Sequence, residues 1–98
     1  MVTREQLAAF LYRYARINGY DISASADISG FTDRESVSEY AAAAMRWAVG
    51  AKIIYGTSNT TLSPKAGATR GQIAAMIYRF ARYYGLDTAM DAAVSSEA

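Results

Sequence analysis

At 98 residues, with ten Lys and Arg against nine Asp and Glu, the chain has room for one small domain and carries a net charge of +1. This balance argues against a general nucleic-acid or membrane-surface binder, because both need a strong basic excess. The absence of Cys and His rules out a disulfide scaffold and a thiolate metal site, and removes the commonest acid/base catalyst. The chain also lacks a run of about 18 apolar residues. We therefore expect a domain that is not an enzyme, needs no metal or cofactor, and does not insert into a membrane.

The chain contains two copies of one segment. Residues 3–21, TREQLAAFLYRYARINGYD, recur as residues 69–87, TRGQIAAMIYRFARYYGLD. In each copy apolar side chains stand at i, i+3, i+4 and i+7, which predicts an amphipathic helix that buries this face. The face comprises Leu7, Phe10, Leu11 and Tyr14 in the first copy, and Ile73, Met76, Ile77 and Phe80 in the second.

Both predicted helices carry start and stop signals. Thr3 and Thr69 stand at the N-cap position, and each is followed three residues later by a glutamine that completes a capping box. Gly19 and Gly85 stand where a left-handed residue commonly ends a helix. The sequence therefore bounds both helices closely.

Arginines interleaved with tyrosines along both helices offer a second interpretation. Such a set can form a stripe that binds single-stranded nucleic acid. It is more often a solvated helix face whose arginine stems lie on apolar surface, so we expect no nucleic-acid partner. The arginines concerned are Arg13, Arg16, Arg79 and Arg82.

A third helix is predicted between the copies, over residues 35–50. Asp33 or Ser36 can cap its start, and its run of four alanines favours close contact with another helix. The apolar stripe comprises Val37, Tyr40, Ala41, Ala44 and Ala48.

The rest of the chain reads as connections. Residues 51–68 combine a short apolar run with Gly, Asn, Ser and Pro turn signals, which predicts a loop or irregular strand. Residues 86–98 are rich in Ala and Ser, and we expect a linker or tail of frayed helix or disorder. The fold class predicted is all-α, with three main helices and long connecting loops.

The motifs between residues 31 and 85 together resemble a repeat of the S-layer homology family. Residues 2–20 are similar to the second half of a preceding repeat, so the expected organisation is 1–20 as that half, 31–85 as a complete repeat and 86–98 as a tail. The repeat period places the next Phe-x-Asp start at position 97, so we expect the chain to be cut from, or to end, a tandem array. The motifs are Phe31-Thr32-Asp33, residues 45–49 (MRWAV), 53–56 (IIYG), 62–64 (LSP) and 68–70 (ATR).

The resemblance implies a fold and a function. Each repeat is expected to form a helical hairpin, usually three repeats about a pseudo-threefold axis, and to bind pyruvylated secondary cell-wall polymer in grooves between repeats. The module would anchor an exported parent protein to the bacterial cell surface. In the family a Thr-Arg-Ala-Glu motif supplies an arginine to the acidic ketal. The matching positions are residues 3–6 (TREQ) and 69–72 (TRGQ), which keep Thr and Arg and depart afterwards; Trp47 and Gly56 match the family's tryptophan and glycine.

The residues themselves point to the same helix starts. Arg4 and Arg70 each stand in a first turn, where the helix dipole disfavours a cation by about 0.3–1 kcal/mol. Glu5 can neutralise Arg4, whereas Gly71 leaves Arg70 without an adjacent carboxylate, so we infer that Arg70 meets an external anion through its guanidinium fork. Gly71 would let a sugar approach the backbone. The predicted binding residues are Arg70, Thr69, Gly71, Trp47, Gly56, Thr57, Ser58 and Arg4.

Each of these assignments has an alternative. Arg70 and Arg4 also fit surface or salt-bridged arginines, and Trp47 fits core packing as well as a sugar platform, because large aromatics dominate small cores. Asp33 fits a helix cap better than a ligand or metal site. The alternative function is a protein-interaction or oligomerisation module, since one and a half repeats expose apolar surface that a longer array would cover, which would permit self-association.

Overall fold

The computed structural model describes residues 1–86, and its three α-helices confirm the predicted all-α class. They are α1 (Arg4–Ile17), α2 (Ala42–Gly50) and α3 (Arg70–Tyr83), with two short 3-10 turns, η1 (Arg34–Ser36) and η2 (Glu39–Ala41), before α2. Within residues 1–86 there is no strand beyond one isolated bridge between Thr3 and Gly67. None of the described helices has the length and apolar character needed to cross a membrane. The expected tail lies, from residue 87 onward, outside the described residues.

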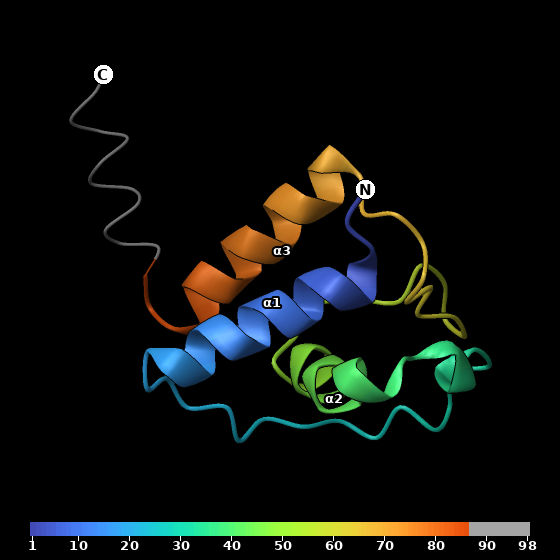
Figure 1. Cartoon of the computed structure of the whole chain (residues 1–98), viewed down its shortest axis with the longest axis horizontal. Helices are drawn as coiled ribbons and strands as arrows, with labels where there is room; N and C mark the ends of the chain where they lie inside the picture. Colours follow the sequence, from blue (N-terminus) through green and yellow to red (C-terminus); the bar gives the residue numbers. More distant parts are fainter. Residues whose placement is uncertain (87–98) are drawn as a thin grey trace.

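Helix α1 lies between α2 and α3, and the loop after α2 returns to the N-terminal end of α1 (Figure 1). The core forms where α1 faces α2 and this loop. Trp47 is the largest side chain in the core and packs edge-on against Phe80 of α3, with ring centroids 6.2 Å apart. Phe80 also lies edge-on to Tyr14 of α1, with ring centroids 5.9 Å apart, so α3 contacts both other helices through this one ring. The buried apolar residues of α1 are Leu7, Ala8, Leu11 and Ala15.

The predicted caps of the two repeated helices are confirmed. The hydroxyl of Thr3 accepts the backbone N–H of Gln6 at 3.2 Å, and the backbone N–H of Thr3 donates to Oε1 of Gln6 at 2.8 Å. α3 has the same reciprocal pair between Thr69 and Gln72. Both predicted C-terminal glycines have positive φ, of 73° and 72°, a conformation that glycine adopts without strain. Local sequence signals therefore determine the ends of α1 and α3.

The third predicted helix begins later than expected, at Ala42 instead of residue 35, and the predicted caps are wrong. Asp33 caps no helix, because its carboxylate accepts the backbone N–H groups of Leu62 and Ser63 at 2.9 and 2.8 Å. Ser38 likewise donates its backbone N–H to Glu5 at 2.9 Å. These long-range bonds take groups that a continuous helix would have used, and residues 34–36 and 39–41 form two separate 3-10 turns instead.

Residues 20–29 form an extended segment for which the sequence analysis assigned no element. Its residues are alternately half-buried and exposed, and Ile22, Ala24 and Ile28 pack on the core. Gly50 at the end of α2 permits the close crossing, because a Cβ there would lie 2.8 Å from the backbone of Ser25. The segment covers α2 and links the two halves of the chain.

The apolar faces of the repeated helices are buried only in part. Leu7, Leu11, Met76 and Phe80 are buried, but Phe10 is 62% exposed, Tyr14 45% and Ile77 43%. Phe10 and Tyr14 occupy in α1 the positions that Met76 and Phe80 occupy in α3. The prediction is therefore wrong for these three positions, because all three side chains line an open groove between α1 and α3 instead of the core.

Candidate functional site

A concave site of about 410 Å³ lies between the N-terminal half of α3 and the turn at residues 54–57. We call it the α3 pocket. Five of the predicted binding residues line it, namely Arg4, Gly56, Thr57, Thr69 and Gly71, and no Asp or Glu does. The other lining residues are Ile54, Tyr55, Gln72, Ala75, Met76 and Arg79.

Arg4 reaches the pocket from the start of α1, and its expected pairing with Glu5 is wrong. Only 4% of Arg4 is exposed. Its Nε donates to the carbonyl oxygen of Leu62 at 2.9 Å and one terminal nitrogen donates to the carbonyl of Tyr55. Burial, followed by the charge of Arg79, lowers the pKa of Arg4, while Asp33 acts in the opposite sense. A buried cation thus fixes the loop and brings positive charge to the pocket.

Glu5 has a different set of partners. Its carboxylate accepts the hydroxyl of Ser38 at 2.6 Å and forms an ion pair with Lys65 at 3.2 Å. Tyr40 donates its hydroxyl to the same carboxylate at 3.2 Å. Burial alone would raise the pKa of Glu5, but the hydrogen bonds from Ser38 and the charge of Lys65 outweigh it and hold the pKa below its usual value. Glu5 therefore joins α1 to η2 and to the loop before α3, and Asp33 is the carboxylate whose charge acts favourably on Arg4.

Of the two charged residues that line the pocket, Arg79 was not among the predicted binding residues. Its guanidinium carbon lies 4.4 Å from the centroid of the Tyr55 ring, a cation–π arrangement. Helical spacing could have found it, because Gln72, Ala75, Met76 and Arg79 stand at i, i+3, i+4 and i+7 and share one face of α3. Arg4 and Arg79 together make this concavity cationic.

Arg70, the predicted main charge partner, is exposed and does not line the α3 pocket, although both its neighbours do. Within residues 1–86 its side chain makes no hydrogen bond or ion pair, so the salt-bridged alternative has no support there. Successive residues of a helix point in different directions, which places Arg70 beside the lining face. Thr69 and Gly71 therefore lie on the wall of the pocket, whereas Arg70 does not.

Trp47 belongs to the core, and its role as a sugar platform is not supported. The side chain is 1% exposed, and its indole N–H donates to the hydroxyl of Tyr84 at 3.2 Å. The ring also packs edge-on against Tyr12 at 5.4 Å. Of the two roles expected for Trp47, the structure supports core packing.

The turn at residues 56–63 begins at the pocket wall, to which it contributes Gly56 and Thr57, and its own contacts fix its shape. A Cβ on Gly56 would lie 2.5 Å from the carbonyl oxygen of Ser58 and 2.6 Å from that of Thr61, so only glycine fits there. The hydroxyl of Thr57 lies 2.6 Å from that of Ser63. Ser58, predicted to contact ligand, instead lies outside the lining and accepts the backbone N–H of Thr61 at 3.1 Å. Its role in this structure is to shape the turn.

Residues 30–74 match the family model of the S-layer homology domain. This segment is an S-layer homology domain. The match covers η1, η2, α2, the turn of the α3 pocket and the first part of α3, so most of the pocket lies within it. S-layer homology domains are non-catalytic modules that bind cell-wall polymers and occur in surface-anchored proteins, which indicates cell-wall anchoring at the cell surface. No curated protein and no solved structure matches the chain.

Proposed function

We propose that the chain attaches its parent protein to an acidic wall glycan, of the pyruvylated class, through the α3 pocket. The observation that carries the proposal is the pair Arg4 and Arg79 on one concavity whose lining contains no carboxylate. A carboxylate on a sugar would meet two guanidinium groups, and each charge-assisted hydrogen bond contributes about 1.5–3 kcal/mol. The role matches the anchoring function of the S-layer homology domain.

The two arginines are suited to different parts of this task. Arg4 uses Nε and one terminal nitrogen on carbonyl groups, so it is held rigidly and its remaining N–H groups are already oriented. Arg79 lies over the face of Tyr55, an arrangement that leaves the edge of the guanidinium for a carboxylate. The charge of Arg79 also lowers the pKa of Arg4, so a bound anion would relieve repulsion between them.

Arg70 and Gly71 complete the proposed site. Arg70 would add charge at the margin of the pocket, where a longer polymer passes. A Cβ added to Gly71 would meet no atom closer than the Thr69 hydroxyl oxygen, at 4.0 Å. The backbone of α3 is therefore open toward the pocket at this position. A sugar ring could approach this glycine closely, with the exposed ring of Tyr55 on the opposite wall.

Binding of the purified chain to wall sacculi tests the proposal. Arg79→Ala should weaken binding by about tenfold or more, which corresponds to about 1.4 kcal/mol or more, and Arg79→Lys should restore it in part. Arg82→Ala is the matched control, because it removes the same charge from the same helix outside the α3 pocket. Retention of the wild-type chain by sacculi stripped of their polymer, or full binding by Arg79→Ala, would contradict the proposal.

A second candidate function is self-association through an apolar groove between α1 and α3. The groove has a volume of about 440 Å³ and includes the exposed Phe10, Tyr14 and Ile77. Met76 and Phe80, at the equivalent positions of α3, are buried against the rest of the chain. Phe10 and Tyr14 have no such cover within the described residues, so a second copy of the chain could bury them in an interface. A second copy of the chain is the partner we consider. The remaining lining residues are Leu11, Phe80, Ala81 and Leu86.

Light scattering at several protein concentrations tests this candidate. A dimer that Ile77→Asp abolishes would support it, with Tyr78→Asp as a control on the same helix outside the groove. A monomer at every concentration up to the millimolar range would contradict it.

A further inference from the structure

The extended segment at residues 20–29 leaves backbone hydrogen-bonding groups without a partner. Figure 1 shows it running along the outside of the molecule, past α2. Within residues 1–86, the N–H groups of Ser25 and Asp27 and the carbonyl groups of Ser23, Ser25 and Asp27 form no hydrogen bond, and all three residues are exposed. Asp21 differs, since its carbonyl group accepts the hydroxyl of Tyr84 at 2.7 Å. An extended chain with such free groups is a template for pairing with another strand.

The free groups share one edge of the segment. Backbone groups of alternate residues in an extended chain point to opposite edges. Ala26 donates its N–H to the carbonyl oxygen of Arg46 at 3.0 Å, so the even-numbered residues turn these groups toward α2 and the odd-numbered residues turn theirs away from it. Ile22, Ala24 and Ile28 meanwhile pack on the core. The segment is therefore held in place by its inner side chains and by one edge, while its outer edge is open.

The sequence of this segment complements itself in the antiparallel direction. Residues 21–29 read DISASADIS. When two copies are aligned about Ser25, apolar residues face apolar residues of the same size, and each aspartate faces a serine. No aspartate then faces another, which matters because like charges directly opposite each other destabilise a strand pair. The facing pairs are Ile22 with Ile28, Ala24 with Ala26, Ser23 with Asp27, and Asp21 with Ser29.

Hydrogen bonding and charge both favour the alignment about Ser25. In that register the free N–H and carbonyl groups of Ser25 meet the same groups of the second copy, and the N–H of Asp27 meets the carbonyl group of Ser23. An alignment about Ala24 would instead place Asp21 of each copy opposite Asp27 of the other. Both aspartates are exposed, so their charges would repel at both ends of the pair.

We propose that the outer edge of the extended segment is an interface with a second copy of the chain, paired antiparallel about a twofold axis at Ser25. The same surface serves both copies, so the assembly closes at two. Main-chain hydrogen bonds would hold the pair, and the facing side chains would set its register. The interface uses no residue of the α3 pocket and none of the groove between α1 and α3, so it goes beyond both functions proposed above.

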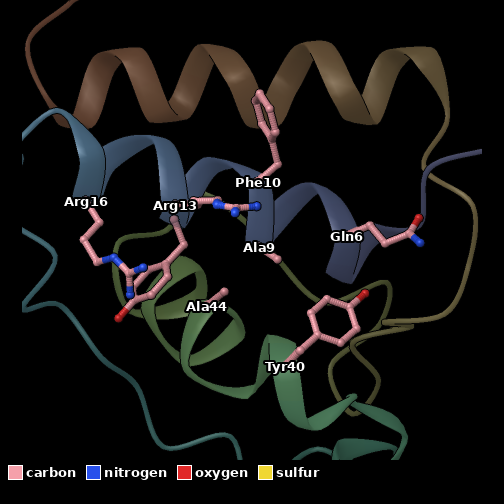
Figure 2. Close-up of a pocket in the computed structure, with 8 residues that line it drawn as sticks. Gln6, Ala9, Phe10, Arg13, Arg16, Tyr40 and Ala44 are labelled. Carbon is pink, nitrogen blue, oxygen red and sulfur yellow. The ribbon is translucent and has the colours of Figure 1, made fainter.

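A concavity of about 640 Å³ on α1 is the rival partner for the exposed aspartates of a second copy. Arg13 and Arg16 line it, on the side of α1 that faces η2 (Figure 2). Such a contact would depend on Arg13, whereas the antiparallel pairing would not. Four residues of α1 in this lining occupy the positions that pocket residues hold in α3, namely Gln6, Ala9, Phe10 and Arg13 for Gln72, Ala75, Met76 and Arg79.

Charge substitution at Ser25 tests the proposal, because this residue would face itself across the axis. Sedimentation of the whole chain at several concentrations should show a dimer. Ser25→Lys and Ser25→Glu should each weaken dimerisation by about tenfold or more, and an equimolar mixture of the two variants should restore it. Ser25 is exposed, so circular dichroism should show an unchanged fold. Ser36→Lys, at an exposed position outside the segment, is the matched control and should leave the dimer unchanged.

Disulfide formation gives a second measurement of the same register. The chain contains no cysteine. Directly opposite residues of an antiparallel pair have Cα atoms about 4.5–5.5 Å apart, within the range that a disulfide spans. Ser25→Cys should therefore form a covalent dimer under mild oxidation, and Ser36→Cys should not. Equal crosslinking of the two variants would contradict the register.

The remaining outcomes overturn the proposal. A monomer at every concentration up to the millimolar range would show that the edge does not pair. A dimer that persists in Ser25→Lys and is lost in Ile77→Asp would place the contact in the groove between α1 and α3. Loss in Arg13→Ala would place it at the concavity on α1. None of these measurements involves a glycan, so the interface and the function of the α3 pocket can fail separately.

Discussion

Arg4 and Glu5 are adjacent in the sequence and both buried, yet their side chains serve opposite purposes. The carboxylate of Glu5 forms an ion pair with Lys65 and accepts hydrogen bonds from Ser38 and Tyr40. Arg4 instead donates to neutral carbonyl groups. A buried charge whose hydrogen bonds go only to dipoles is costly, and the charge of Asp33 offsets this cost only in part, because the pKa of Arg4 is still lowered. This separation of neighbouring charges leaves the α3 pocket cationic, and it is the residue-level reason to expect an acidic ligand.

Replacement of Gly71 tests how closely the ligand approaches α3. Gly71→Ala should stabilise the folded chain by about 0.5–1 kcal/mol, because alanine loses less backbone entropy in a helix and an added Cβ has open space around it. The same methyl group would project toward the sugar and weaken glycan binding. Thermal unfolding and sacculus binding measure the two effects separately. A more stable variant with unchanged binding would show that the ligand does not contact this backbone.

At the level of elements, three segments that are distant in sequence are tied together at the α3 pocket. The first backbone N–H groups of α1 donate to the loop before α3, from Arg4 to Ala66 at 3.0 Å and from Glu5 to Pro64 at 2.9 Å. Helix N-termini leave such donors unpaired unless another segment supplies acceptors. The start of α1 therefore positions the loop that leads into α3, and a change at one segment should be felt at the others.

Asp33 holds the pocket wall without lining the pocket, and its removal tests this coupling. Asp33→Ala would leave the backbone N–H groups of Leu62 and Ser63 without their acceptor, which should reduce the free energy of unfolding by about 1–3 kcal/mol and weaken glycan binding. Asp27→Ala is the control, because Asp27 accepts only a local N–H, from Ser29 at 2.9 Å. Chemical denaturation and sacculus binding are the measurements. Equal effects of the two substitutions would contradict the role assigned to Asp33.

Stability should also fall in acid, for a reason that involves the same connections. The pKa values of Glu5 and Asp33 are both lowered in the folded chain, through hydrogen bonds and nearby cations that outweigh burial. A lowered folded pKa means that the stabilisation is present above the unfolded pKa, about 4, and is lost as the pH falls below it. Urea denaturation at several pH values measures this loss. Glu5→Gln should flatten the dependence below about pH 4, and an unchanged slope would contradict the assignment.

Local signals predicted the repeated helices and their caps, because a capping box and a terminal glycine act within a few residues. Residues 34–41 could not be predicted in this way, since their conformation depends on Glu5 and on the Asp33 bonds to the distant 62–63 loop. The same limit applies to the residues that line the α3 pocket. Thr69, Gly71 and Gly56 were predicted from the sequence to bind ligand and lie together in this pocket, whereas Arg79 joins them only when α3 packs beside the 54–57 turn.

At the level of the whole molecule, α1 is part of the core even though it lies outside the matched S-layer homology segment. Its caps and its pocket-facing residues repeat in α3, which supports the proposal that residues 1–20 are the second half of an upstream repeat and residues 31–85 a complete one. Residues 1–20 and 31–85 nevertheless share one core in this structure, because Leu7 and Leu11 are buried in it.

Deletion of residues 1–20 tests this dependence. The remaining chain would lose the apolar side chains of α1 and the Glu5 and Arg4 anchors, so we expect it to show no cooperative unfolding transition. Circular dichroism during thermal or urea denaturation measures this. Restoration of the transition by adding residues 1–20 as a peptide would support the account, while a sharp transition in the truncated chain alone would contradict it.

The central claim is that arginines of the α3 pocket recognise the acidic group of a wall glycan, and a calorimetric cycle tests it most directly. It compares polymer with and without its pyruvate ketal, for the wild-type chain and for Arg79→Ala. The account predicts that removal of the ketal weakens wild-type binding by about tenfold or more and has a much smaller effect on the variant, because the two changes remove one interaction. An equal loss in both proteins, or no loss in the wild-type chain, would contradict it.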